Sequence, residues 1–153
     1  MKIRRERRMH PHHFFTREEK QRITGAIAAA EARTAGEIRV HVESDAGGEP
    51  VTRARQVFAA LGMNRTEAEN GVLIYLAVRE RKFAIIGDRG IDRVVPAGFW
   101  EDTKETMAGF FREGKFVEGV VHGIESAGEH LAKYFPRAAD DVNELTDAIS
   151  EGK

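Results

Sequence analysis

The chain contains no cysteine, which excludes disulfide bonds and thiolate metal sites and leaves the redox compartment open. It also lacks any apolar run close to the roughly 20 residues that a membrane-spanning helix needs. The formal net charge is only −1, so no overall field points to a nucleic acid or an anionic membrane as the partner. These absences favour an ordinary globular chain.

The length and composition fit one domain. A chain of 153 residues can bury a single sizeable core, and 41% hydrophobic with 32% charged residues is typical of soluble globular proteins. The first residues, MKIRRERRMH, are basic like the start of an export signal, but Pro11, histidines and a charged helix start replace the apolar segment that should follow. We therefore expect a cytoplasmic chain with a flexible basic arm at residues 1–13.

The sequence is organised around a predicted β-hairpin. Val72 to Val78 is an unbroken apolar run, too short for a typical helix, which predicts a fully buried strand. A second apolar run, Phe83 to Ile86, follows a short charged link, so the two strands should pair antiparallel. Gly87 and Gly90 then permit positive φ and place the Asp88 carboxylate on a turn at the sheet edge. That turn is the first candidate for a site.

The segment Glu37 to Glu43 alternates between apolar and polar residues. This pattern predicts a strand with one covered face, more typical of a sheet edge than of its centre, with His41 as a surface residue. The order strand, helix, strand predicts that it runs parallel to residues 72–78 through a right-handed crossover. The acidic, glycine-rich loop that follows makes Glu43 and Asp45 a second candidate cluster.

Helices are predicted where apolar residues recur at helical spacing. The first begins at Thr16, which can form a capping box with Glu19, and ends near Arg33. Further helices are expected over residues 51–61, from about 97 to 112, over 116–135, and, after Asp140 or Asp141, a last short one with Val142, Leu145 and Ile149. Strands flanked by helices predict an α/β fold, a three-layer α/β/α sandwich with a small mixed sheet.

Several short motifs occur in order along the chain: Thr34-Ala35-Gly36-Glu37-Ile38, Asn70-Gly71-Val72-Leu73, the glycine-containing turn after Ile86, and the run from Phe111 to Val120. Together they resemble the TPM domain, named for thylakoid, photosystem-associated and nematode membrane proteins. The resemblance covers residues 14–136 and implies a Rossmann-like sheet with helices on both faces. Residues 137–153 would then form a short helix and tail.

The resemblance also implies an activity. Some plant members of the family are described as acid phosphatases, and some bacterial members bind divalent cations such as Ca²⁺. Many relatives carry a signal sequence and a membrane anchor, and the lack of both here suggests a soluble branch. Where many relatives read Gly-Tyr-Gly-Leu-Glu at the turn, this chain has Asp92 at the acidic position and no tyrosine. An aspartate that relatives place a few residues further on is replaced by Val95-Pro96-Ala97.

Divalent cation binding is the first functional hypothesis, with Ca²⁺ or Mg²⁺ as the cofactor, because carboxylate, amide and carbonyl oxygens are the ligands of hard cations. If the hairpin forms, Glu69 and Asn70 lie close to Asp88 and to Asp92, at one end of the sheet. Glu43 and Asp45 lie at the opposite end. The sequence alone does not choose between the two ends.

Two other functions stay open. A phosphatase would use Asp88 or Asp45 with Arg89 near the phosphate charge, either metal-assisted or through an aspartate nucleophile. A non-enzymatic module would bind a protein partner through the basic arm, Arg53, Arg55 and the charged link at residues 79–82. We expect a monomer that does not bind nucleic acid.

Overall fold

The computed structural model describes residues 11, 13–137 and 148–152. In chain order its elements are α2 (Arg17–Glu31), β1 (Glu37–Glu43), α3 (Pro50–Ala60), the 3₁₀ helix η1 (Met63–Arg65), β2 (Gly71–Ala77), β3 (Lys82–Gly87), α4 (Arg89–Asp92), α5 (Glu101–Arg112), α6 (Phe116–Tyr134) and β4 (Ser150–Glu151). Within these ranges, none of the helices is both long and apolar enough to span a bilayer.

The sheet has the strand order β3-β2-β1-β4. β2 pairs antiparallel with β3 through the predicted hairpin, and β1 runs parallel to β2, as its crossover predicts. The expectation that β1 is an edge strand is wrong for its second half, because β4 pairs with His41 and Val42 on its free side. The alternation in β1 therefore does not mark a solvent-exposed face.

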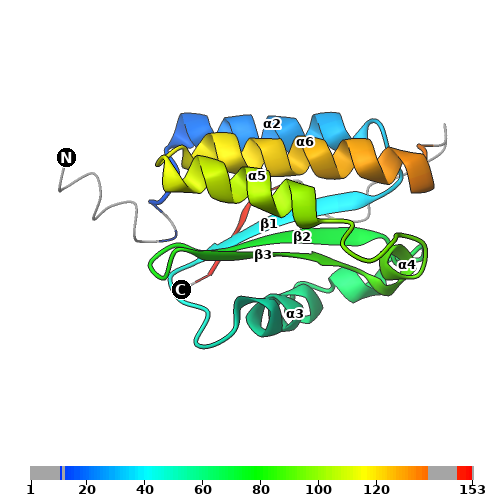
Figure 1. Ribbon diagram of the computed structural model, residues 1–153, viewed down its shortest axis with the longest axis horizontal. Helices are drawn as coiled ribbons and strands as arrows, with labels where there is room; N and C mark the ends of the chain where they lie inside the picture. Colours follow the sequence, from blue (N-terminus) through cyan, green and yellow to red (C-terminus); the bar gives the residue numbers. More distant parts are fainter. Residues whose placement is uncertain (1–10, 12, 138–147, 153) are drawn as a thin grey trace.

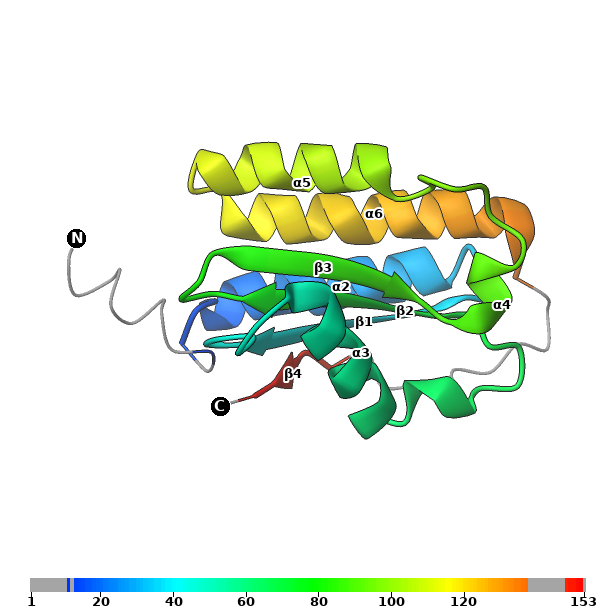
Figure 2. The same ribbon diagram turned by 60° about the horizontal axis from the view of Figure 1, so that its bottom comes forward.

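Helices cover both faces of the sheet, which confirms the three-layer α/β/α arrangement. α2, α5 and α6 lie on one face and α3 lies on the other (Figures 1 and 2). The larger core cluster joins the β1 residues Ile38, Val40 and Val42 to the three-helix layer. A second cluster packs α3 against the opposite face, where Leu73 and Tyr75 of β2 point.

Most helix boundaries follow the local signals, but α4 forms where a turn was expected and α5 begins late. Thr16 and Glu19 form the predicted capping box at the start of α2. Gly114 takes a φ of 76° between α5 and α6, a left-handed conformation that glycine adopts without strain. α5 begins at Glu101 rather than near Ala97, because Gly98, also left-handed with a φ of 77°, interrupts the helical backbone.

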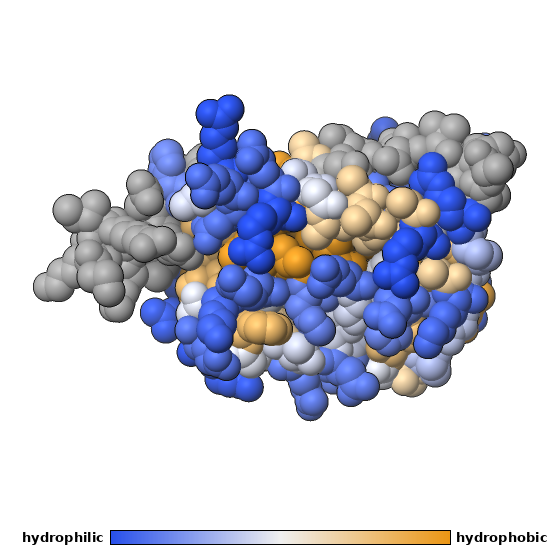
Figure 3. Space-filling model, turned by 90° about the horizontal axis from the view of Figure 1, so that it is seen from above, coloured by the Kyte–Doolittle hydropathy of each residue, from blue (hydrophilic) through white to orange (hydrophobic). Residues whose placement is uncertain are grey.

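The ends of the chain are described only in part. The basic arm falls outside the described residues, apart from Pro11 and His13, and so does most of the predicted last helix. Its final residue, Ile149, is not helical: it packs against the larger core cluster just before β4. Seen from the helical side, hydrophilic residues cover most of the surface, and hydrophobic patches lie between them (Figure 3).

Candidate functional site

The six candidate residues lie at two opposite ends of the sheet. One end holds Glu43 and Asp45, and the other holds Glu69, Asn70, Asp88 and Asp92. The pairing of Val72 with Gly87 brings the start of β2 beside the end of β3, as the hairpin predicts. Figure 1 shows α4, which follows Asp88, at the opposite end of the molecule from the β2–β3 turn.

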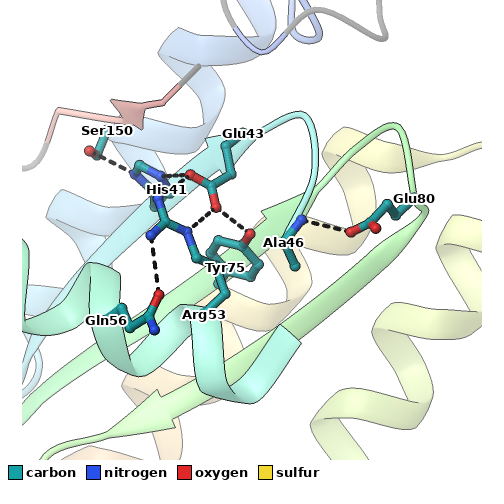
Figure 4. A network of polar contacts seen from close by, with 8 residues as sticks. All are labelled: His41, Glu43, Ala46, Arg53, Gln56, Tyr75, Glu80 and Ser150. Carbon is teal, nitrogen blue, oxygen red and sulfur yellow. Dashed lines mark hydrogen bonds and ion pairs between the residues drawn. The ribbon is translucent and has the colours of Figure 1, made fainter. Parts of the chain in front are cut away.

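Glu43 is at the centre of a buried polar network (Figure 4). Glu43 is only 3% exposed, and its carboxylate accepts hydrogen bonds from the Tyr75 hydroxyl and from Arg53, at 2.7 Å from Nε and 3.0 Å from Nη2. The His41 ring lies 3.1 Å away through Nε2. Burial alone would raise the pKa of Glu43. The hydrogen bonds, led by that of Arg53, outweigh this effect and lower the pKa to about 2. Glu43 is therefore a buried, ionised carboxylate.

His41 is buried, so the prediction of a surface histidine is wrong. Its Nδ1 lies 2.9 Å from the hydroxyl of Ser150, on β4, and its ring stacks on Tyr75. Burial lowers the pKa of His41, and the hydrogen bond with Glu43 only partly offsets this. Burial, followed by the hydrogen bond to Glu43, raises the pKa of Tyr75. Both groups are therefore neutral near pH 7.

The line Ser150, His41, Glu43 contains the residue types of a hydrolase triad, but Glu43 is also held by Arg53 and Tyr75, and the segment after β4 packs on it. A Cβ at Gly152 would lie 2.8 Å from Glu43 Oε1 and 3.0 Å from His41 Nε2. The backbone after β4 thus packs directly on the His41–Glu43 pair. The network holds β4 on β1 and α3 on the sheet.

Sequence analysis missed this network. Ser150 is 109 positions from His41, and no motif joins them. One signal was present: Tyr75 interrupts an otherwise aliphatic buried strand, and a buried tyrosine hydroxyl needs a hydrogen-bond partner.

Asp45, the other candidate at this end, is paired with Arg79. The Arg79 guanidinium binds both carboxylate oxygens, with Nε 3.0 Å from Oδ1. The neighbouring Ala46 N–H donates to Glu80 at 2.7 Å, so the loop after β1 is tied to the β2–β3 turn. Both carboxylates of the first cluster are thus already bound by arginine.

Asp88 has a different environment at the other end. It is 6% exposed, and its Oδ1 accepts from the Arg89 N–H at 2.7 Å, which caps α4. Its Oδ2 is buried and has no hydrogen-bond partner among the described residues. The Asp88 N–H donates to the Gly71 carbonyl at 2.9 Å, which fixes the residue at the start of β2.

The glycines around Asp88 do not use positive φ, so that prediction is wrong. Gly90 is required for a different reason, because a Cβ there would lie 2.4 Å from the carbonyl oxygen of Ala68 and 2.5 Å from that of Glu69. The absence of a side chain lets α4 approach the segment before β2. Two backbone carbonyls consequently lie against the turn that carries Asp88.

The other three candidates at this end are Glu69, Asn70 and Asp92, and each has contacts within the fold. Glu69 Oε1 accepts from Arg93 at 2.7 Å, and Oε2 pairs with Arg89 at the same distance. These contacts, led by the hydrogen bond from Arg93, lower the pKa of Glu69. The Asn70 side-chain amide donates to the Ala35 carbonyl at 3.0 Å. Asp92 Oδ1 lies 3.7 Å from a Cβ built on Gly87, so it faces the end of β3.

The second cluster is not a complete carboxylate cage. Across residues 13–137 and 148–152, the structure contains no group of three or more His, Cys, Asp or Glu side chains that could hold a metal ion by themselves. A cation at this end would need backbone carbonyls and water in addition to Asp88.

The fold and the polar ends of its sheet define an α/β/α sandwich domain with a mixed four-stranded sheet. The chain belongs to the TPM domain family, whose pattern matches residues 9–130. The resemblance in the sequence motifs is thereby confirmed.

Solved structures support this assignment. The NMR structure of the BA42 protein from Bizionia argentinensis is 47% identical, with a TM-score of 0.86 over 91% of this chain and 96% of that one. The N-terminal domain of cg2496 from Corynebacterium glutamicum (17% identity, TM-score 0.63, 85% of this chain and 81% of that one) shares the fold. So does an N-terminal domain from P. gingivalis (19% identity, TM-score 0.65, 79% and 78%). A search of curated proteins found no match.

Proposed function

We propose that this TPM domain binds a divalent cation, Ca²⁺ or Mg²⁺, at the end of the sheet where Asp88 lies. The observation that carries the proposal is Asp88 Oδ2, a buried carboxylate oxygen without a hydrogen-bond partner among the described residues. Leaving such an oxygen unpaired costs about 1–3 kcal/mol or more, and a bound cation would remove this cost.

The two ends of the sheet differ in how far their carboxylates are already neutralised. Arg53 and Tyr75 occupy the oxygens of Glu43, and Arg79 occupies those of Asp45. A cation there would have to displace ion pairs that the fold uses. At the other end, Glu69 is the only candidate whose side chain is paired with an arginine among the described residues. The Asp88 end is therefore the better cation site.

The ligand set would be mixed. Asp88 Oδ2 supplies the charge, the segment at Ala68 and Glu69 supplies carbonyl oxygens, and Asp92 can add a second carboxylate. Water completes the six to eight ligands of Ca²⁺ or the six of Mg²⁺. With so few fixed charges, the dissociation constant is expected on the order of 10⁻⁴–10⁻³ M.

The test is an amide NMR titration of the full chain with CaCl₂ and with MgCl₂. Asp88→Asn removes the charge but keeps a side chain that caps helices well. Saturable shifts are expected at residues 69–71 and 87–92, with the dissociation constant at least ~10-fold higher in Asp88→Asn. Asp45→Asn is the matched control and should leave the affinity unchanged.

Other outcomes would overturn the proposal. Shifts confined to residues 43–48 would move the site to the other end of the sheet. The absence of saturable shifts up to ~10 mM cation would refute cation binding, since even weak calcium modules bind in the range of 10⁻⁴–10⁻³ M.

The phosphatase alternative is tested on the same sample. Asp88 would be the nucleophile, and Arg89, whose side chain is 79% exposed and pairs with Glu69, would turn from that pair to the phosphate charge. Turnover of p-nitrophenyl phosphate that Asp88→Asn abolishes would support an enzyme. If the protein neither binds a cation nor turns over the substrate, the protein-interaction module is the remaining hypothesis. A cytoplasmic location and a monomeric state stay predictions.

A further inference from the structure

A cavity of about 410 Å³ lies at the end of the molecule away from Asp88. The turn between β2 and β3, the end of α5 and the start of α6 surround it, and Figure 2 shows these segments together at one end of the sandwich. Its volume is within the roughly 300–1,000 Å³ of small-molecule sites. None of the cation-site candidates lines it.

Four phenylalanines lie in the apolar walls of the cavity. Phe83 and Phe111 meet edge to face with their centroids 5.1 Å apart, as do Phe14 and Phe116. Phe111 also stacks on Phe116, at 6.1 Å. Phe83, Phe111 and Phe116 are only partly buried, so a ligand in the cavity would remove further aromatic surface from water. The interior therefore favours an apolar body.

The rim of the cavity is cationic. Arg81, Lys82 and Arg112 line it and are exposed, and no Asp or Glu is among the described residues that line it. None of the three forms an ion pair with another described residue, whereas nearby Arg79 pairs with Asp45. The cavity thus combines an apolar interior with positive charges that have no counterion in the described part of the chain.

We propose that this cavity binds a small amphiphilic anion, an aliphatic or aromatic body that carries one carboxylate or phosphate group. The apolar body would lie among the phenylalanines, and the anionic head would contact Arg81, Lys82 and Arg112 at the rim. The basic segment at residues 1–8 has the same sign of charge as the rim, so charge complementarity does not favour it as the occupant. The site is independent of the proposed cation site.

The test compares four probes that share a ten-carbon chain by amide NMR titration of the full chain, the ionic probes below their micellar concentrations and decan-1-ol below its solubility limit. Decanoate and decyl phosphate should bind saturably with shifts at residues 76–83 and 108–116. Decan-1-ol should bind about tenfold more weakly, and decyltrimethylammonium should not bind. The ratio of the two anion affinities identifies the preferred head group. Equal affinity for decanoate and decan-1-ol, or no saturable binding of either anion, would overturn the proposal.

Variants separate the two halves of the site. Lys82→Gln combined with Arg112→Gln should weaken decanoate about tenfold and leave decan-1-ol unchanged, which also shows that the cavity is intact. Arg55→Gln combined with Lys104→Gln removes the same charge away from the cavity and should change neither. Ala108→Leu, which fills part of the cavity, should weaken both. Equal effects of the two charge variants on decanoate would show a general electrostatic effect and refute the site.

Discussion

Arg53 of α3 holds the Glu43 carboxylate of β1 through two guanidinium nitrogens, at 2.7 Å and 3.0 Å. This pair is a polar link between α3, on one face of the sheet, and the end of β1. Because Glu43 is 3% exposed and ionised, it depends on its donors for solvation. The Glu43 carboxylate, a candidate cation ligand from the sequence, thus links α3 to β1 in the fold.

Arg53→Ala should lower the free energy of unfolding by about 1–2 kcal/mol. Removing one partner leaves a buried carboxylate short of its strongest donor, but Arg53 is 38% exposed, so water replaces part of the interaction. Urea unfolding at pH 7 measures the change. Arg55→Ala, two positions away on the same helix, is the control and should change the free energy by no more than about 0.5 kcal/mol. Equal losses in the two variants would contradict this account.

Stability should fall as the pH is lowered from about 5 to 2, because the pKa of Glu43 is about 2 in the folded chain against an ordinary 4.5. Glu43 accepts a proton at a higher pH in the unfolded chain than in the folded chain. The ionised Glu43 therefore contributes its full stabilisation above its pKa in the unfolded chain, and this contribution is lost as the pH falls through its pKa in the folded chain. The contribution is roughly 3 kcal/mol. The pKa of His41 is also lowered in the folded chain, in this case by burial. Below about pH 6.5 the unfolded chain therefore binds a proton at His41 that the folded chain resists, which also lowers stability as the pH falls.

Urea unfolding across this pH range tests the assignment. Glu43→Gln, which cannot ionise, should be less stable than the wild type at pH 7 and should lose less of its stability between pH 5 and pH 2. An unchanged pH dependence in Glu43→Gln would show that other carboxyl groups cause the acid sensitivity.

Two glycine substitutions should have opposite effects. Gly90→Ala brings a Cβ against the carbonyls of Ala68 and Glu69, which cannot move aside as a side chain can, so a loss of about 1–3 kcal/mol is expected. Gly25→Ala, in the middle of α2 with open space around it, should gain up to about 1 kcal/mol. Thermal unfolding of the two variants measures both changes. A loss at Gly25 would mean that α2 packs more tightly there.

Calcium should stabilise the wild type more than Asp88→Asn. At a free concentration tenfold above the dissociation constant, binding to the folded state alone adds about 1.4 kcal/mol. Thermal unfolding with and without CaCl₂ measures this gain, and equivalent NaCl at the same ionic strength is the control. An equal gain in the variant would place the bound calcium elsewhere.

The sequence predicted the layers and the hairpin well, because their signals are local. The apolar run at residues 72–78 is long enough to define a buried strand, and Thr16 with Glu19 defines a helix start. Gly114 marks a helix end for the same reason. Each of these patterns depends on neighbours within a few positions.

The polar contacts were not predictable in this way. Alternation in β1 indicated one wet face, but Arg53 of α3 and Ser150 of β4 contact the polar side chains of that face, and His41 and Glu43 are buried. Glu43 of β1 pairs with Arg53 of α3 and Tyr75 of β2, so these contacts depend on how α3 packs on the sheet and on how the two strands align. Gly90 was singled out for the wrong reason. A pair of glycines suggests a turn with positive φ, but Gly90 is needed because its backbone lies close to Ala68 and Glu69, and the sequence gives no sign of that contact.

The pairing of β4 with β1 has a consequence for the order of folding. The first three strands lie within residues 37–87, whereas the contact between His41 and Ser150 closes a loop of 109 positions. Forming this contact costs conformational entropy, which the two residues of β4 and the flanking contacts of Ile149 and Gly152 offset. The sheet should therefore assemble from the hairpin outward, with β4 docking last and opening first. Among the strands, the amide protons of β4 should exchange fastest with solvent.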